Sequence, residues 1–155
     1  MTANALRIIH ASLTATLTKP AARNHPREQP NLPTINRTYN GTITRDGTVF
    51  EPPHLWDCAF IVNTDTLETL IVQHSAWRDA PSSFPVYDTI TKYSEATQTR
   101  AAVPGTSVAT KGDGVLYYPQ FKAEFQQPLK IANDMGNGWY QVNFQLIETE
   151  IVPAP

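Results

Sequence analysis

Apolar and polar residues alternate along much of this chain, and that period predicts β-strands. In residues 5–17, apolar side chains occupy every second position, with polar side chains between them. Successive side chains of a strand point to opposite faces, so this segment predicts one strand with a single buried face. The residues expected on that face are Ile9, Ala11, Leu13, Ala15 and Leu17.

Two hairpins are predicted from turn residues that separate alternating segments. Asp46-Gly47 lies between residues 34–45 and the short run 48–51. Both residues of this pair tolerate the positive φ that a type I′ turn requires, so the first hairpin should reverse there. The second hairpin should reverse within residues 133–138. Its second arm has the clearest alternation in the chain, with one face formed by Tyr140, Val142, Phe144 and Leu146.

One segment has the period of a helix. Asp65 and Glu68 have the spacing of a capping box, which marks the start of a helix. Apolar and aromatic residues then recur at helical intervals, at Leu67, Leu70, Ile71, His74 and Trp77. We therefore expect one α-helix over about residues 65–77, with its apolar stripe packed on a sheet.

The remaining segments predict further strands. Residues 84–99 predict one long strand, and residues 101–125 add two or three strands around a turn at 112–114. Residues 54–63 predict a strand with Trp56, Cys58, Phe60 and Val62 on one face. The predicted fold is mainly β, an antiparallel β-sandwich or open β-barrel of about seven to nine strands with one flanking α-helix. It should form a single domain over residues 1–155.

Residues 19–33 interrupt the strand pattern. This stretch contains four prolines and almost no apolar residues. Proline has no amide donor, so the stretch cannot join the centre of a sheet. We expect a long extended loop or arm, of the kind that contacts a partner.

The charge content is low for a protein that works as a free monomer. Charged residues make up 17% of the chain, hydrophobic residues make up 41%, and the net charge is −2. Because repulsion between solvated charges keeps surfaces apart, this shortage favours a subunit that buries surface in an assembly. No stretch has the density of Lys and Arg that nucleic acids or anionic membranes attract, so neither is an expected partner.

Targeting signals and disulfides are not predicted. The N-terminal segment lacks the apolar block of a signal peptide because Arg7 and several polar residues interrupt it. No apolar run has the length of about 18 residues that a membrane-spanning helix needs. The single cysteine, Cys58, excludes an internal disulfide and fits a reducing cytoplasm. The two glycosylation-like triplets, at Asn36 and Asn40, are read as coincidence in a chain rich in Thr and Asn.

His54, Asp57 and Cys58 are the obvious candidates for nucleophilic catalysis. A cysteine nucleophile needs a histidine in contact and a third group that orients it. Adjacent residues of a strand point to opposite faces, so Asp57 and Cys58 cannot line one pocket. We predict that Cys58 belongs to the core and that the chain is not an enzyme.

Metal and carboxylate chemistry are also not predicted. The four histidines, His10, His25, His54 and His74, lack the spacing of metal ligands. The segment 111–115 lacks most of the carboxylates of a calcium loop and is read as a turn. Glu148 and Glu150 should share an exposed face of the last strand. We therefore expect no metal and no cofactor.

Flat aromatic rings leave sugar binding as an alternative. The rings that could stack on a saccharide are Trp56, Trp77, Trp139, Tyr117 and Tyr118. Trp56 and Trp77 lie in apolar patterns and Trp139 follows a turn glycine, so core packing is the favoured interpretation for each.

The order of elements resembles the small β-barrel proteins of bacteriophage tails, of the tail-tube, distal-tail and baseplate type. The resemblance is carried by the hairpin segment 35–56, the helix segment 64–77 and the terminal strand segment 136–152, which together make up about a third of the chain. It implies a sandwich or open barrel with a flanking helix, whose subunits join sheets around a ring. A long loop would reach a neighbouring ring, which is a role that residues 19–33 would suit.

The resemblance implies a non-enzymatic structural subunit, located in the virion and made in the host cytoplasm. Its expected partners are copies of itself in a homo-oligomeric ring and other virion structural proteins. Two alternatives stay open. One is a head decoration or neck protein, and the other is a soluble carbohydrate-binding β-sandwich module.

Overall fold

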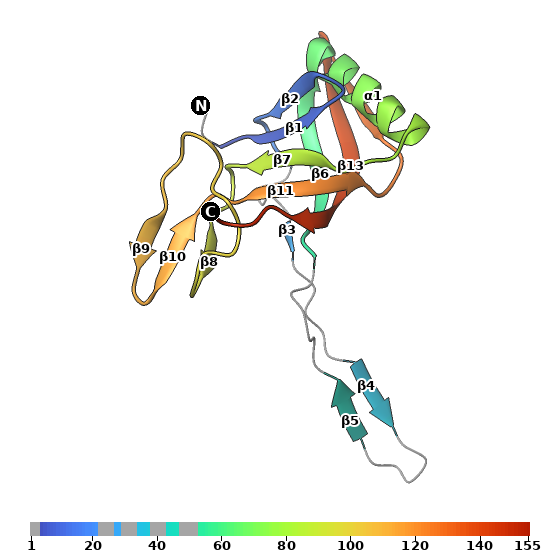
Figure 1. The fold of residues 1–155 in the computed structure, drawn as a ribbon. Helices are drawn as coiled ribbons and strands as arrows, with labels where there is room; N and C mark the ends of the chain where they lie inside the picture. The colour runs from blue at the N-terminus through green and yellow to red at the C-terminus, as the bar shows by residue number, and fades with distance from the viewer. Residues whose placement is uncertain (1–3, 22–26, 29–33, 38–42, 47–52) are drawn as a thin grey trace.

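An antiparallel sheet of eight strands makes up most of the fold (Figure 1). The computed structural model describes residues 4–21, 27–28, 34–37, 43–46 and 53–155, and describes side chains in the first and last of these ranges. The strand order is β2-β1-β7-β11-β13-β6-β3, and β12 pairs with β13 beside β11. The strands of this sheet are β1 (Leu6–His10), β2 (Leu13–Leu17), β3 (Arg27–Glu28), β6 (Leu55–Asn63), β7 (Phe84–Asp88), β11 (Gln120–Phe125), β12 (Lys130–Gly136) and β13 (Trp139–Ile151). The predicted mainly β class is confirmed.

The sheet curls into a half-barrel. β2 and β6 are far apart in the strand order, but the segment that follows β2 pairs with β6. The two sides of the curled sheet meet at this pairing. The amide of Ile61 donates to the carbonyl of Lys19 at 2.8 Å, and the amide of Ala21 donates to the carbonyl of Ala59 at 2.8 Å. Closing a sheet in this way removes exposed edges, which are otherwise free to pair with other chains.

The concave face of the half-barrel holds the core. Alternate residues of the central strands point inward, as the period of two requires. The predicted faces of β6 and β13 are confirmed, because Trp56, Cys58, Phe60 and Val62 are buried, as are Val142, Phe144 and Leu146. The other strands contribute Leu6, Ile8, Ala15, Leu17, Phe84, Val86, Phe121, Ala123 and Phe125.

The predicted helix is confirmed as α1 (Thr64–Asp79), which packs against β2, β6, β11 and β13. Asn63 caps it, with its side-chain oxygen accepting from the amide of Thr66 at 2.9 Å. The expected capping box at Asp65 and Glu68 is therefore wrong, because the chain enters the helix two residues earlier, directly from β6. Asn63 thus ends one element and starts the next.

The side chain of Gln73 hydrogen-bonds helix α1 to the hairpin of β1 and β2. Its amide nitrogen donates to the carbonyls of Ile8 at 2.9 Å and Leu13 at 3.0 Å. The side chain is fully buried. A buried amide that reaches carbonyls at both ends of a turn fixes the helix relative to that turn.

The N-terminal segment forms a hairpin and not the single strand that was predicted. Ala11 and Ser12 form its turn with φ of 52° and 60°, and Leu6 pairs with Leu17. The buried face therefore combines Leu6 and Ile8 with Ala15 and Leu17, so Ile9 was placed on the wrong face. The inward positions change from even to odd numbers across the two-residue turn, but Ile9 and Ala11 are also apolar, which is why the pattern looked like one strand.

The single strand predicted over residues 34–45 is also wrong, and the predicted turn at Asp46-Gly47 lies partly outside the described residues. β4 (Thr34–Arg37) pairs with β5 (Ile43–Asp46) so that Thr34 lies opposite Asp46 and Arg37 lies opposite Ile43. The chain therefore reverses between Arg37 and Ile43, a stretch whose sequence contains Asn40-Gly41, which is an equally strong turn signal. Gly47 and the run 48–51 lie outside the described residues.

Residues 84–99 form two strands in different sheets, where one long strand was predicted. After β7, the carboxylate of Asp88 accepts from the amides of Ile90 at 2.9 Å and Thr91 at 3.2 Å, which turns the chain. β8 (Tyr93–Glu95) then pairs with β10 (Gly114–Tyr117), which also pairs with β9 (Ala109–Lys111). The predicted turn at 112–114 joins β9 to β10.

The proline-rich stretch 19–33 falls largely outside the described residues. Its described parts, residues 19–21 and β3, lie along β6 at the border of the main sheet. Proline is compatible with such a border position because one side of the strand needs no donor.

We expect replacement of Ala11-Ser12 by Asn-Gly to raise the free energy of unfolding by about 1 kcal/mol. Both residues have left-handed φ, which costs energy for most residues with a Cβ. Gly has no Cβ and Asn tolerates this conformation better than Ala or Ser. Urea unfolding would measure the change. The control Thr16→Gly, in the interior of β2, should destabilise instead. An unchanged midpoint for Asn-Gly would show that the turn is not strained.

Candidate functional site

The structure separates the three candidates for nucleophilic catalysis. Cys58 is 1% exposed, and its burial, with a smaller contribution from the charges of Asp88 and Asp57, raises the pKa of its thiol well above the ordinary value. Asp57 is exposed on the opposite face of β6. The ring of His54 is buried against Tyr93 and Phe121, at centroid distances of 5.2 and 5.0 Å. The predicted core position of Cys58 is confirmed, while the absence of enzymatic activity stays a prediction.

The histidines pack against aromatic rings. His10 lies 5.0 Å from Phe84 and His74 lies 5.0 Å from Phe125, measured between ring centroids. His25 lies outside the described residues. Within residues 4–21 and 53–155, no three His, Cys, Asp or Glu side chains are grouped so that they could hold a metal ion. The described part of the chain also has no helix with the length and apolarity needed to cross a bilayer.

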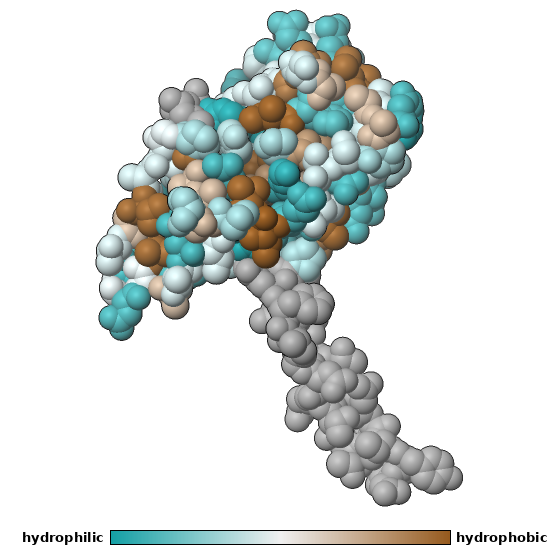
Figure 2. Space-filling model, in the orientation of Figure 1, coloured by the Kyte–Doolittle hydropathy of each residue, from teal (hydrophilic) through white to brown (hydrophobic). Residues whose placement is uncertain are grey.

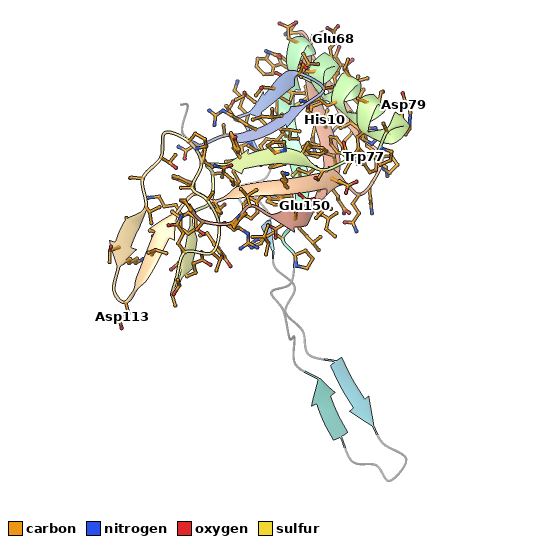
Figure 3. The ribbon with its side chains drawn as sticks, in the orientation of Figure 1. His10, Glu68, Trp77, Asp79, Asp113 and Glu150 are labelled. Atoms are coloured by element: carbon orange, nitrogen blue, oxygen red, sulfur yellow. The ribbon has the colours of Figure 1, made fainter. Side chains whose placement is uncertain are left out.

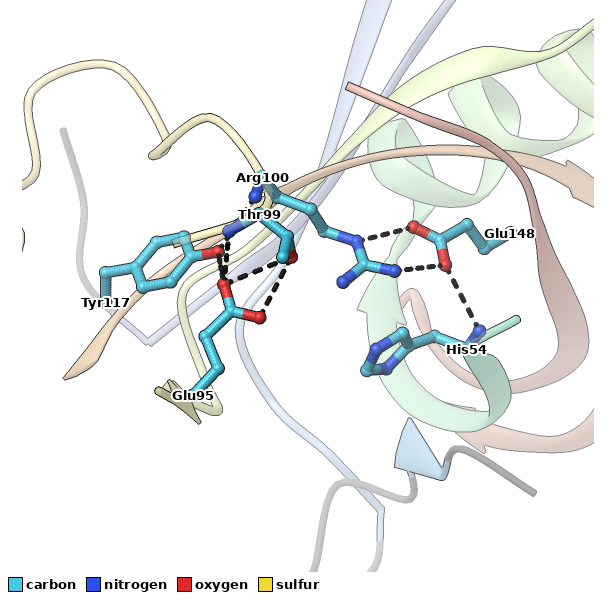
Figure 4. Close-up of polar contacts among 6 residues, drawn as sticks. All are labelled: His54, Glu95, Thr99, Arg100, Tyr117 and Glu148. Atoms are coloured by element: carbon cyan, nitrogen blue, oxygen red, sulfur yellow. Dashed lines mark hydrogen bonds and ion pairs between the residues drawn. The ribbon is translucent and has the colours of Figure 1, made fainter. Parts of the chain in front are cut away.

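A buried ion pair replaces the exposed carboxylate that was predicted at Glu148 (Figure 4). Arg100 donates from Nε to Glu148 Oε2 and from a terminal nitrogen to Oε1, each at 2.9 Å. The two side chains are 1% and 3% exposed. Glu148 continues the inward face of β13 after Leu146, and a register shift against β11 then leaves Glu150 exposed beside Lys122.

A second set of contacts continues from Arg100 into the sheet β8-β10-β9 (Figure 4). The backbone amide of Arg100 donates to the Tyr117 hydroxyl at 3.1 Å, and that hydroxyl donates to Glu95. The amide of Thr99 also donates to Glu95, at 2.7 Å. The amide of His54 donates to Glu148 Oε1 at 3.4 Å. We call the set His54, Glu95, Thr99, Arg100, Tyr117 and Glu148 the clasp. It joins the smaller sheet to the main one.

The charged groups of the clasp are held by one another and by aromatic rings. The guanidinium satisfies both oxygens of Glu148, and it lies 5.5 Å from the ring centroids of Tyr93 and Phe121. Burial, and then the hydrogen bond to Glu95, raise the pKa of Tyr117 to about 12. In the sequence, the sign that Glu148 is buried was its place at an inward position of the otherwise apolar face of β13.

The aromatic side chains divide between core and surface. Trp56 is buried, with its indole N–H donating to Asp88 at 3.3 Å, and partly buried Trp77 donates to Glu124 at 3.1 Å. Trp139 is 36% exposed, and its predicted core position is wrong. It is the first residue of β13, opposite Asn63 at the end of β6, where the core layer ends.

The other aromatic candidates contact basic side chains or belong to the clasp. The ammonium of Lys19 lies 4.2 Å from the ring centroid of Trp139. Tyr117 is buried, whereas Tyr118 is half-buried with Lys92 at 5.4 Å from its ring centroid. Of the five rings that the sequence offered for stacking, Trp139 is the one that the structure exposes most clearly beside a cleft.

The edge strand β12 is the most exposed strand of the main sheet whose side chains the structure describes. All seven of its residues are exposed, including Ile131 at 52% and Met135 at 54%. Within the described residues it pairs with β13 alone, so its outer edge keeps unpaired backbone groups. Figure 2 shows apolar side chains scattered among polar ones on the visible face.

Two clefts flank this region. The first has a volume of about 130 Å³, lies beside Lys19 and Trp139, and is otherwise lined by Thr16, Thr18, Ile61, Val62, Asn63 and Thr66. The second has a volume of about 180 Å³ and lies under the connection between β11 and β12. Its lining is mostly polar, from Asp57, Gln127, Pro128, Lys130, Asn143, Phe144 and Gln145.

Comparisons with known proteins found no match to a protein family, to a curated protein or to a solved structure. The clasp, the edge strand and the two clefts therefore carry the functional argument.

We expect Glu148→Ala to lower the free energy of unfolding by about 3 to 5 kcal/mol, because it leaves the buried Arg100 charge without its carboxylate. Urea unfolding would measure this loss. The matched control is Glu150→Ala, which removes the exposed partner of Lys122 and should cost less than about 1 kcal/mol. Equal effects of the two substitutions would contradict the clasp.

Tyr117 should make stability fall at alkaline pH. Its pKa of about 12 in the folded chain exceeds the value of about 10 in an unfolded chain. The folded state therefore holds this proton more tightly, so the stabilisation is complete below pH 10 and declines as the pH rises from 10 to 12. Urea midpoints of the wild type and Tyr117→Phe should converge over that interval. Tyr118→Phe controls for the loss of one hydroxyl, and a constant difference would refute the assignment.

Proposed function

We propose that this chain is a non-enzymatic structural subunit of a bacteriophage virion, most consistent with a tail-tip, baseplate or tail-tube-like ring protein. The observation that carries the proposal is β12, an edge strand exposed on both faces with two large apolar side chains at its surface. Such an edge is a hazard in a free monomer and becomes a contact when the next subunit covers it.

The surface composition supports the same conclusion. The outward side chains of β13 are Gln141, Asn143, Gln145 and Ile147, which are half-buried and uncharged. Amide side chains can both donate and accept hydrogen bonds, so they can satisfy the polar groups of a facing subunit without a charge partner. A surface of this kind suits broad contact between copies, where few charges have to be desolvated.

The segment between β2 and β6 adds support. β4 and β5 pair with each other and, in Figure 1, lie beyond the main sheet. A two-stranded element outside the main sheet is marginal on its own and gains stability from packing on something else. In a stacked assembly, a neighbouring ring would supply that surface. A head decoration or neck protein would use the same features.

A soluble carbohydrate-binding module is the second candidate. It is favoured by one observation, the exposed ring of Trp139 beside a cleft that also holds Lys19. An exposed indole can stack on the apolar face of a sugar. A change in tryptophan fluorescence on addition of glycans, without any change in oligomeric mass, would favour this candidate.

The test of the proposed function is the native mass across a concentration series, measured by light scattering and followed by negative-stain imaging. We expect the mass to rise above that of one chain and to reach a discrete multimer, which imaging should show as a ring. A single-chain mass at every concentration, alone and with other proteins of the same virion, would contradict the proposal.

The contribution of β12 can be tested by substitution. We expect the double variant Ile131→Lys and Met135→Lys to raise the concentration at which multimers form by at least about tenfold, because it places charges in the contact. The matched control is Ile71→Lys and Val72→Lys on α1, where the side chains are similarly exposed at 43% and 49%. Equal effects of both pairs would move the contact away from β12.

A further inference from the structure

Most charged side chains that the structure describes have a partner. Ion pairs, hydrogen bonds or aromatic rings engage all but six of those in residues 4–21 and 53–155. The six are Asp57, Asp65, Glu68, Lys111, Asp113 and Lys130. Asp65 and Glu68 lie near the N-terminal end of α1, where the helix dipole favours negative charge. The other four occupy two places, and each place holds one charge of each sign.

The first place is the larger of the two clefts, which has a volume of about 180 Å³. Asp57 lies opposite Gln145 in the pairing of β6 with β13, and Lys130 lies opposite Asn143 in the pairing of β12 with β13. The Asp57 carboxylate and the Lys130 ammonium therefore lie on opposite sides of the cleft, with the amide side chains of Asn143 and Gln145 between them. The side-chain oxygen of Asn143 is buried and has no hydrogen-bond partner among the described residues, which leaves an acceptor unsatisfied in the free chain.

The second place is the tip of the hairpin formed by β9 and β10. Lys111, Gly112, Asp113 and Gly114 make a tight turn in which Gly112 has a φ of 59°. Figure 3 shows Asp113 at the end of this hairpin, pointing away from the rest of the molecule. A Cβ at Gly114 would lie 2.6 Å from the carbonyl oxygen of Glu95, so this glycine lets the hairpin pack closely on β8.

The tip and the cleft lie at opposite ends of the molecule. The hairpin precedes β11, and the cleft lies at the connection that follows β11, which points away from the hairpin in Figure 1. The two places are therefore separated within one chain. A head-to-tail contact requires two different surfaces on one chain, and such contacts form rings when the rotation between copies closes.

We infer that the β9–β10 tip of one copy docks into the cleft of the next copy, with Lys111 toward Asp57 and Asp113 toward Lys130. This inference rests on the proposed ring-forming function and names a contact within it. Charges of opposite sign on both sides fix the orientation of the docked turn, since the reversed orientation would place like charges together.

Charge reversal tests the pairing. Asp57→Lys alone should raise the concentration for half-assembly by about tenfold, because it places a positive charge against Lys111. Lys111→Asp alone should do the same. The chain with both substitutions should assemble at the wild-type concentration or below, because its cleft is wholly positive and its tip wholly negative. Asp65→Lys is the control and should have no effect.

Cross-linking separates this inference from the proposed function. Chains carrying both Lys130→Cys and Asp113→Cys, treated with a short bismaleimide, should form a ladder of multimers. Either single variant should not, and Cys58 is buried. Rings without a ladder and without rescue by the double charge reversal would overturn the docking contact while leaving the ring. Absence of both the ladder and any multimer would overturn both proposals.

Discussion

The buried ion pair between Arg100 and Glu148 is the constraint on which the rest of the structure depends. A buried guanidinium and carboxylate are stable only when each satisfies the other in close geometry, so the pair permits one relation between the two sheets. Backbone bonds beside it, from the amide of Ala101 to Val152 and from the amide of Ala154 to Thr99, hold the C-terminal segment in the same arrangement. The clasp thus sets the angle at which the β9–β10 hairpin leaves the half-barrel.

In the proposed ring that angle would matter, because a ring closes only when each copy is rotated by a fixed amount relative to the next. The tip belongs to the smaller sheet and the cleft to the main sheet, so the rotation between neighbouring subunits would be set inside each subunit, at the clasp. The edge strand β12 borders the cleft through Lys130. Register shifts at Ile131/Asn133 and Asp134/Gly136 interrupt its alternation, which limits how a second strand can continue the sheet and disfavours open-ended pairing.

The sequence predicted the elements whose pattern is local and repeated. Alternation located β6 and β13 with their buried faces, and the helical period located α1. The sequence pattern did not predict residues whose conformation or burial depends on contacts with residues far away in the chain. The left-handed turn at Ala11-Ser12 is held by tertiary contacts, including the amide of Gln73, and neither residue signals a turn by itself. Burial of Glu148 depends on Arg100, which is 48 residues away in the chain.

The scarcity of charge links these observations. The chain has few charged residues, and most of those that the structure describes contact other groups of the same chain. These contacts lie in the clasp, on helix α1 and against aromatic rings. A surface of amides and hydroxyls provides contact area but little discrimination between orientations, because such groups accept many partners. Orientation then has to come from the few charges that remain. Asp57 with Lys130 and Lys111 with Asp113 form opposite-sign pairs at two separate places on the chain, so they can specify a direction for the proposed assembly that the neutral surface between them cannot.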